Sequence, residues 1–115
     1  MKTTLSLLLL PAIGACASLP APSPPHPPYH AVGTEPFWSL LIDEREISFT
    51  EPDAQPLRQP TPKVIIGIAG EIYQTPRINV NIVHGRCSDG MSDRSYPDKV
   101  QVTVDGRRFN GCGGL

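Results

Sequence analysis

Two cysteines in the C-terminal third of the chain flank the residues best suited to chemistry. Cys87 opens a polar stretch that runs to Pro97, and Cys112 follows after one further hairpin. The stretch offers hydroxyl, carboxylate, guanidinium and phenol groups, as loops that bind a partner often do. Its candidate binding residues are Asp89, Ser92, Asp93, Arg94 and Tyr96.

The cysteine count favours a disulfide between Cys87 and Cys112. The chain has three cysteines, and the third, Cys16, lies at the end of a leader. A redox or metal role for the pair is the weaker alternative, because the spacing is neither Cys-x-x-Cys nor that of a zinc site. We therefore expect no cofactor and no metal. Closing this loop stabilises a domain by about 3.5 kcal/mol, and we expect the bridge to close one edge of a sheet.

The stretch Ser88–Pro97 has two interpretations. In the architectural one, Asp93 caps local backbone N–H groups, Arg94 pairs with a carboxylate, and Tyr96 packs under the sheet. In the binding one, the disulfide holds Ser92, Asp93 and Arg94 ready for a partner, such as a lysozyme-like cell-wall enzyme.

A hydrolase that uses Ser92, His84 and Asp89 is a further alternative. The chain lacks the glycine pattern of a nucleophile elbow around Ser92, so we expect no enzyme and assign no catalytic residues.

Residues 1–15 resemble a lipoprotein signal peptide. One lysine precedes a short apolar run, and Ile13-Gly14-Ala15-Cys16 resembles a lipobox, although the same small residues also suit an ordinary signal peptidase. With lipidation, the palmitate-type acyl chains on Cys16 would anchor the protein in a lipid bilayer. Ala17, rather than aspartate, favours the outer membrane, facing the periplasm.

A proline-rich tether follows, so that residues 16–29 separate the anchor from a domain at residues 30–115. The eleven residues from Leu19 to Tyr29 include six prolines and would reach about 34 Å when extended. Without Lys2 the chain has nine basic and eleven acidic side chains, a net charge of about −2. With that balance, and with no cluster of basic residues beyond Arg107-Arg108, we expect no nucleic-acid partner.

Alternating apolar residues predict an all-β fold, a small antiparallel barrel or sandwich of six to seven strands closed by one disulfide. The pattern pairs Ile42 with Ile47 and Leu40 with Phe49, and the Asp105-Gly106 turn pairs Val102 with Phe109. Proline-rich residues 51–62 are expected to form a surface loop. Val64, Ile66 and Ile68 alternate on one face of a further strand, and Trp38 is expected in the core.

Two motifs carry a resemblance to a known family. Gly33-Thr34-Glu35-Pro36-Phe37-Trp38 and Cys87-Ser88-Asp89-Gly90-Met91-Ser92-Asp93-Arg94-Ser95-Tyr96-Pro97, with the later Gly111-Cys112, resemble a family of uncharacterised bacterial envelope proteins described as lipoproteins or membrane proteins. The resemblance implies location and fold, but no activity. The chain departs from the family pattern at Asp98, where an aromatic or other bulky residue is expected. Size, lipidation and β character are loosely similar to the META-domain heat-shock and lysozyme-inhibitor lipoproteins.

Overall fold

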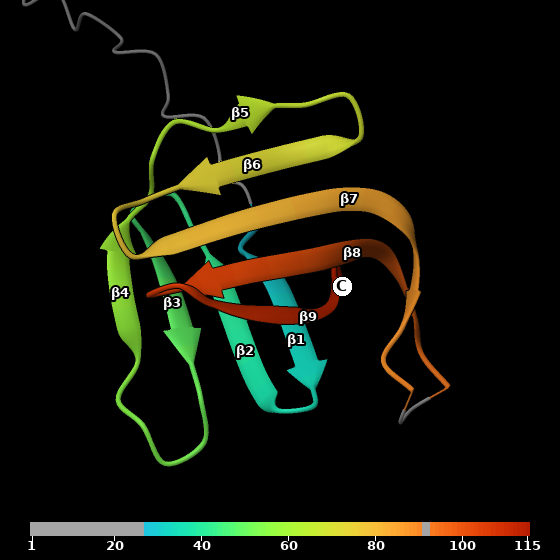
Figure 1. Ribbon diagram of the computed structural model, residues 1–115. Coiled ribbons are helices and arrows are strands. Elements are labelled where there is room, and N and C mark those ends of the chain that lie inside the picture. Colours follow the sequence, from blue (N-terminus) through green and yellow to red (C-terminus); the bar gives the residue numbers. More distant parts are fainter. Residues whose placement is uncertain (1–26, 91–92) are drawn as a thin grey trace, which may run out of the picture.

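The computed structural model describes residues 27–90 and 93–115, which form one antiparallel sheet of nine strands (Figure 1). The described residues contain no helix. The strands are β1 (Tyr29–Thr34), β2 (Phe37–Ile42), β3 (Glu46–Thr50), β4 (Leu57–Pro60), β5 (Ile65–Ile66), β6 (Gly70–Gln74), β7 (Ile78–Ser88), β8 (Ser95–Val104) and β9 (Arg107–Gly113).

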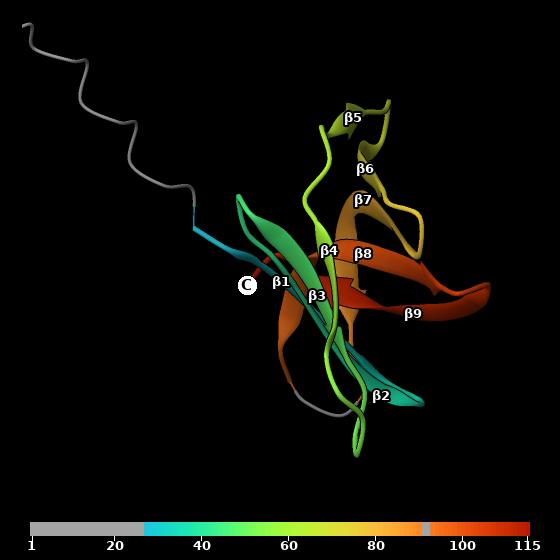
Figure 2. The ribbon, with the colours of Figure 1, turned by 90° about the vertical axis from the view of Figure 1, so that its left-hand side faces the viewer.

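The sheet consists of two meanders joined side by side. Its order is β4-β3-β2-β1-β9-β8-β7-β6-β5, so only the contact between β1 and β9 joins strands far apart in sequence. In Figures 1 and 2 the sheet curls, and β1–β4 run across β7–β9. The curl brings the apolar faces of the two meanders together, which is how one sheet can enclose its own core.

The predicted registers are confirmed. Leu40 lies opposite Phe49 and Ile42 opposite Ile47, and all four side chains are buried. Val102 lies opposite Phe109, and the turn between β8 and β9 has positive φ at both Asp105 (48°) and Gly106 (84°), as a type I′ turn requires. Apolar matching across neighbouring strands thus set the pairing.

Trp38 joins the two meanders in the core, as expected. It is 4% exposed, its ring stacks on Phe49 at 5.9 Å between centroids, and Phe109 meets it edge-on at 6.4 Å. The indole N–H donates to the carbonyl of Asn110 at 3.3 Å. A Cβ at Gly33 would overlap the indole ring, so the glycine of the Gly33–Trp38 motif makes room for the tryptophan.

The predicted strand count was wrong, because the sheet has nine strands rather than six to seven. β1 was not predicted as a strand, and β4 lies inside the expected surface loop at residues 51–62. β4 is an outermost strand, a position in which Pro60 costs no hydrogen bond to a further neighbour. In the segment of Val64, Ile66 and Ile68, only the two residues of β5 pair as a strand, and Ile66 and Ile68 are exposed.

The disulfide is confirmed, but its expected place at a sheet edge was wrong. Cys87 on β7 and Cys112 on β9 are bonded, with 5.6 Å between their Cα atoms. β7 and β9 both flank β8, whereas the sheet edges are β4 and β5. The bridge reaches across β8 where an irregularity between His84 and Cys87 bends β7. No helix long and apolar enough to span a membrane occurs in residues 27–90 and 93–115.

Candidate functional site

The candidate binding loop is shorter than the sequence predicted. β7 extends to Ser88 and β8 begins at Ser95, so the connection consists of residues 89–94. Asp93 and Arg94 are exposed, whereas Tyr96 is 9% exposed within β8, as the architectural interpretation expected. Ser92 lies outside the described residues.

Several contacts fix the base of this loop. The disulfide of Cys87 lies two residues before Asp89, and Tyr96 donates from its hydroxyl to Oδ2 of Asp89 at 3.4 Å. The Thr34 hydroxyl donates to the Asp89 carbonyl at 3.2 Å, which ties the loop to the turn between β1 and β2. The covalent bond and the hydrogen bonds together reduce the conformational freedom of the loop base.

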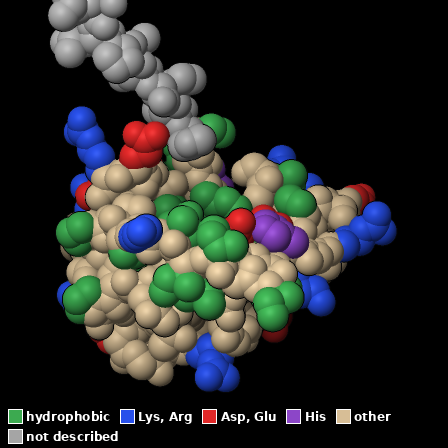
Figure 3. Space-filling view, turned by 90° about the horizontal axis from the view of Figure 1, so that it is seen from above, with side chains coloured by type: hydrophobic (Ala, Val, Ile, Leu, Met, Phe, Trp, Pro, Cys, Tyr) green, Lys and Arg blue, Asp and Glu red, His purple; other side chains and the backbone are tan. Residues whose placement is uncertain are grey.

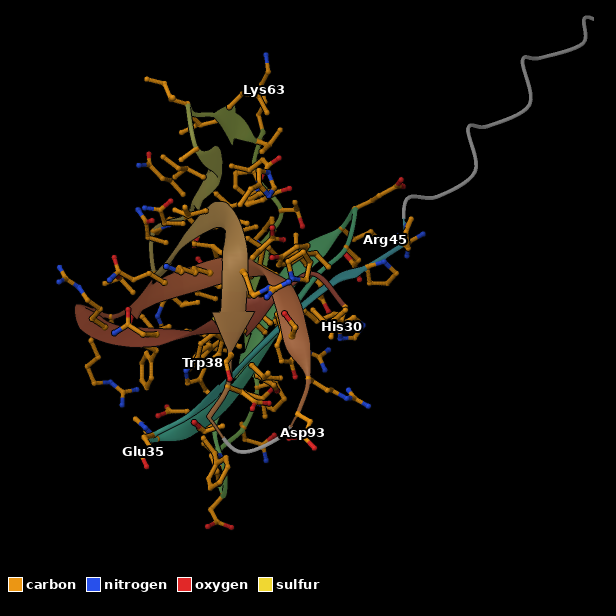
Figure 4. The ribbon with its side chains drawn as sticks, turned by 90° about the vertical axis from the view of Figure 1, so that its right-hand side faces the viewer. His30, Glu35, Trp38, Arg45, Lys63 and Asp93 are labelled. Atoms are coloured by element: carbon orange, nitrogen blue, oxygen red, sulfur yellow. A yellow bond between two sulfur atoms is a disulfide. The ribbon has the colours of Figure 1, made fainter. Side chains whose placement is uncertain are left out.

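The loop and the start of the domain lie at opposite ends of β1. Thr34, at one end of the strand, contacts the loop, whereas Tyr29, at the other, lies opposite Ile42. Figure 4 shows Glu35 and Asp93 at one end of the domain and Arg45 at the other. We call the end with the turn 34–37 and the connection 89–94 the loop end, and the end with Pro27 and the turn 43–46 the tether end.

Two open hollows meet at the disulfide. One, of about 440 Å³, lies over β7, β8 and β9 and is lined by Asn81, Lys99, Gln101 and Asn110. The other, of about 250 Å³, lies between the loop and the turn after β1. Cys87, Ser88, Asn110 and Gly111 line both. The loop base is therefore flanked by concave surface with amide and hydroxyl groups that can exchange hydrogen bonds with a partner.

A second polar group, which the sequence did not predict, surrounds His84 on β7. Its Nδ1 lies 2.7 Å from Oδ1 of Asp98, and its Nε2 lies 2.9 Å from Oε2 of Glu71. The Tyr29 hydroxyl donates to Oδ2 of Asp98 at 2.7 Å. Asp98 is buried at 6% exposure, so this carboxylate depends on the tyrosine and the histidine for the hydrogen bonds that water would otherwise supply. The group ties together β1, β6, β7 and β8.

The two carboxylates favour a positively charged His84. Hydrogen bonds to Asp98 and then to Glu71 raise the pKa of the imidazole above its ordinary 6.5. Burial and the hydrogen bond to Asp98 raise the pKa of Tyr29. With both ring nitrogens engaged, His84 has no nitrogen left to take a proton from a substrate, and its role in this geometry is to compensate charge.

Two residues of the hydrolase alternative, His84 and Asp89, lie within the described part of the chain, and they are not paired with each other. His84 pairs with Asp98 rather than with Asp89. Four residues, from Gly85 to Ser88, lie between His84 and Asp89, which corresponds to roughly 15 Å along an extended strand. Residues 27–90 and 93–115 include no cluster of three histidine, cysteine or carboxylate side chains that could hold a metal ion.

The sequence predicted no partners for His84. Asp98 is the only buried charged residue in the described part of the chain. Sequence spacing could not pair it with Tyr29, which is 69 residues away. Comparisons of the chain with family models, with curated proteins and with solved structures gave no match.

Proposed function

We propose that this protein is a lipid-anchored envelope protein whose β domain binds a partner through the loop at residues 89–94 and the hollows beside it. One observation carries the proposal: the base of the loop is fixed by the Cys87–Cys112 disulfide and by the Thr34–Asp89 hydrogen bond. A loop held in this way loses less entropy on binding than a free one. The exposed side chains of Asp93 and Arg94 can therefore contact a partner with a small loss of conformational entropy in the loop.

The direction of the loop supports the same proposal. A tether on Pro27 leaves the domain at the end opposite the loop, so an anchored protein presents the loop away from the bilayer. Phe37, 55% exposed at the start of β2, adds an aromatic side chain to the loop end. Exposed aromatic side chains beside polar loops are frequent at protein interfaces.

A second candidate is inhibition of a lysozyme-like cell-wall enzyme. Glu35, Asp89 and Asp93 give the loop end several carboxylates, whereas Arg94 lines a hollow together with His30 and Leu115. Carboxylates around a loop favour approach of a partner with a cationic surface. This candidate predicts that the purified protein slows wall hydrolysis by such an enzyme, and that Asp93→Lys reduces the effect.

Site-specific photocrosslinking in cells tests the binding function. The photoreactive residue p-benzoylphenylalanine is placed at Asp93 and, as a matched control, at Gln74, an exposed position at the end of β6. We expect one discrete adduct from position 93 and none from position 74. Equal labelling from both positions, or none from either, would leave the loop with an architectural role only.

A further inference from the structure

The hairpin of β5 and β6 exposes isoleucines that the rest of the domain does not cover. Ile65 is 45% exposed, Ile66 74% and Ile68 110%. Isoleucine is among the residues most often buried, and a group of three exposed together is typical of a surface that contacts something else. By contrast, isoleucines 42, 47, 78 and 82 in the other strands are buried.

The hairpin projects beyond the core. β5 pairs with β6 through two residues only, Ile65 opposite Ile72 and Ile66 opposite Glu71, and the Gly67 N–H donates to the Gly70 carbonyl at 2.7 Å to close the tip. Ile68 stands on that tip. Figure 1 shows the hairpin at the top of the molecule, and the view from above shows hydrophobic side chains gathered on this face (Figure 3).

The base of the hairpin lies next to the point where the tether leaves. A hollow at the tether end is lined by Pro27 and Tyr29 together with Thr61 and Tyr73. Thr61 is four residues before Ile65, and Tyr73 follows Ile72, the partner of Ile65. Pro27, from which the proposed tether extends, therefore lies at the same end of the domain as the base of the hairpin and opposite the binding loop.

We infer that the β5–β6 hairpin, residues 63–74, is a second membrane contact that inserts Ile66 and Ile68 into the interface of the bilayer. The inference rests on the proposed lipid anchor. An anchor on Cys16 keeps the tether exit, and with it the hairpin, within the tether's reach of about 34 Å from the lipid surface. One set of acyl chains and one apolar hairpin act together, as paired signals do in membrane anchoring.

The charges around the hairpin suit a lipid interface. Lys63, exposed and labelled at the top of Figure 4, can extend its ammonium group towards lipid phosphates while its stem lies along apolar surface. Glu71, the acidic residue in the hairpin, faces His84 at 2.9 Å, so its charge is compensated. A second copy of the chain fits the hairpin less well than lipid does. The edge strand β5 has only two residues and so offers little backbone for pairing with another strand.

Tryptophan fluorescence on proteoliposomes tests the hairpin. The full chain is produced with its leader, purified from membranes and reconstituted in vesicles of phosphatidylethanolamine and phosphatidylglycerol that contain a phosphatidylcholine brominated in its acyl chains. Ile68→Trp places a reporter on the tip, and Phe37→Trp places a matched one at the loop end. The buried Trp38 of the unaltered protein gives the baseline and reports the fold.

We expect brominated lipid to lower the added emission of Ile68→Trp by roughly half, and to leave that of Phe37→Trp unchanged. An Ile68→Trp emission that stays at the wavelength of a water-exposed indole overturns the inference. An emission that shifts to the blue without quenching also overturns it, because protein rather than lipid then covers the tip.

The failure of the anchor is distinguishable from the failure of the hairpin. If intact Cys16 protein is found in the soluble fraction without acyl chains, the proposed anchoring is wrong. The same Ile68→Trp protein is then added to the vesicles. Quenching of its emission supports a hairpin that binds the membrane, and unchanged emission contradicts the inferred membrane contact.

Discussion

His84 on β7 and Asp98 on β8 lie directly opposite each other in the sheet, and Nδ1 of the histidine is 2.7 Å from Oδ1 of the aspartate. Glu71 on β6 and Tyr29 on β1 contact this pair, and Tyr73 on β6 lies near Tyr29. Because Asp98 is buried, the charge of His84 links the stability of the domain to pH.

The free energy of unfolding should fall as pH rises above about 6.5. The folded protein raises the pKa of His84, chiefly through its hydrogen bonds to Asp98 and Glu71. The stabilising contribution is complete below the unfolded pKa of 6.5 and is lost as pH passes the higher pKa of the folded protein. Urea unfolding at a series of pH values, for the natural chain and for His84→Gln, measures the difference.

His30→Gln, which alters an exposed histidine on β1, is the matched control and should follow the natural chain. The glutamine of the His84→Gln variant still offers an amide N–H to Asp98, so this substitution removes the titration without removing the donor. Parallel pH profiles for the natural chain and His84→Gln would contradict the prediction.

Replacing both Cys87 and Cys112 with serine should destabilise the domain by about 3.5 kcal/mol, the loop-closure value for 25 residues. Reduction of the disulfide in the natural chain should lower the midpoint of urea unfolding to that of the double serine variant. If reduction leaves the midpoint of the natural chain unchanged, the disulfide does not stabilise the domain by restricting the unfolded chain.

Gly33→Ala should destabilise the domain by roughly 2 kcal/mol, the cost of overpacking a filled core. The added methyl group overlaps the indole of Trp38, and backbone of the sheet leaves the ring little space to move. Gly85→Ala is the control, because a Cβ at Gly85 meets no atom within 4 Å. Thermal or urea unfolding compares the two, and equal stability would show that the ring can shift.

The intact mass of the protein from the membrane fraction should show acyl chains on Cys16, and Cys16→Ser should release the protein from the membrane. Alkylation before and after reduction should label Cys87 and Cys112 only after reduction. An unmodified mass for the membrane-bound chain would contradict the proposed anchor on Cys16. The proposed orientation of the loop end away from the bilayer would then lose its basis.

The strand pairings that the sequence predicted are those in which both partners supply alternating apolar residues. Leu40 with Phe49 and Val102 with Phe109 follow from alternation alone, because each pair has a buried face to fill. β4 was missed because Leu57–Pro60 shows no alternation and ends in proline.

Alternation misled where tertiary structure decides burial. Ile66 and Ile68 follow the pattern of a half-buried strand, but the opposing meander does not extend over them. The sequence also could not predict the polar group around His84. Its members Tyr29 and Asp98 are far apart in the sequence and come into contact only in the folded sheet. The Cys87–Cys112 pair was predictable because the chain holds few cysteines.

The junction between β1 and β9 determines when this protein can finish folding. Each meander is built from neighbouring hairpins and can form locally, but β1 finds Gly113 and Cys112 only through residues near the C-terminal end of the described chain. A chain that emerges from a membrane N-terminal end first therefore exposes the apolar face of β2 and β3 until its last strand arrives. Until then, this apolar face can associate with other unfolded chains.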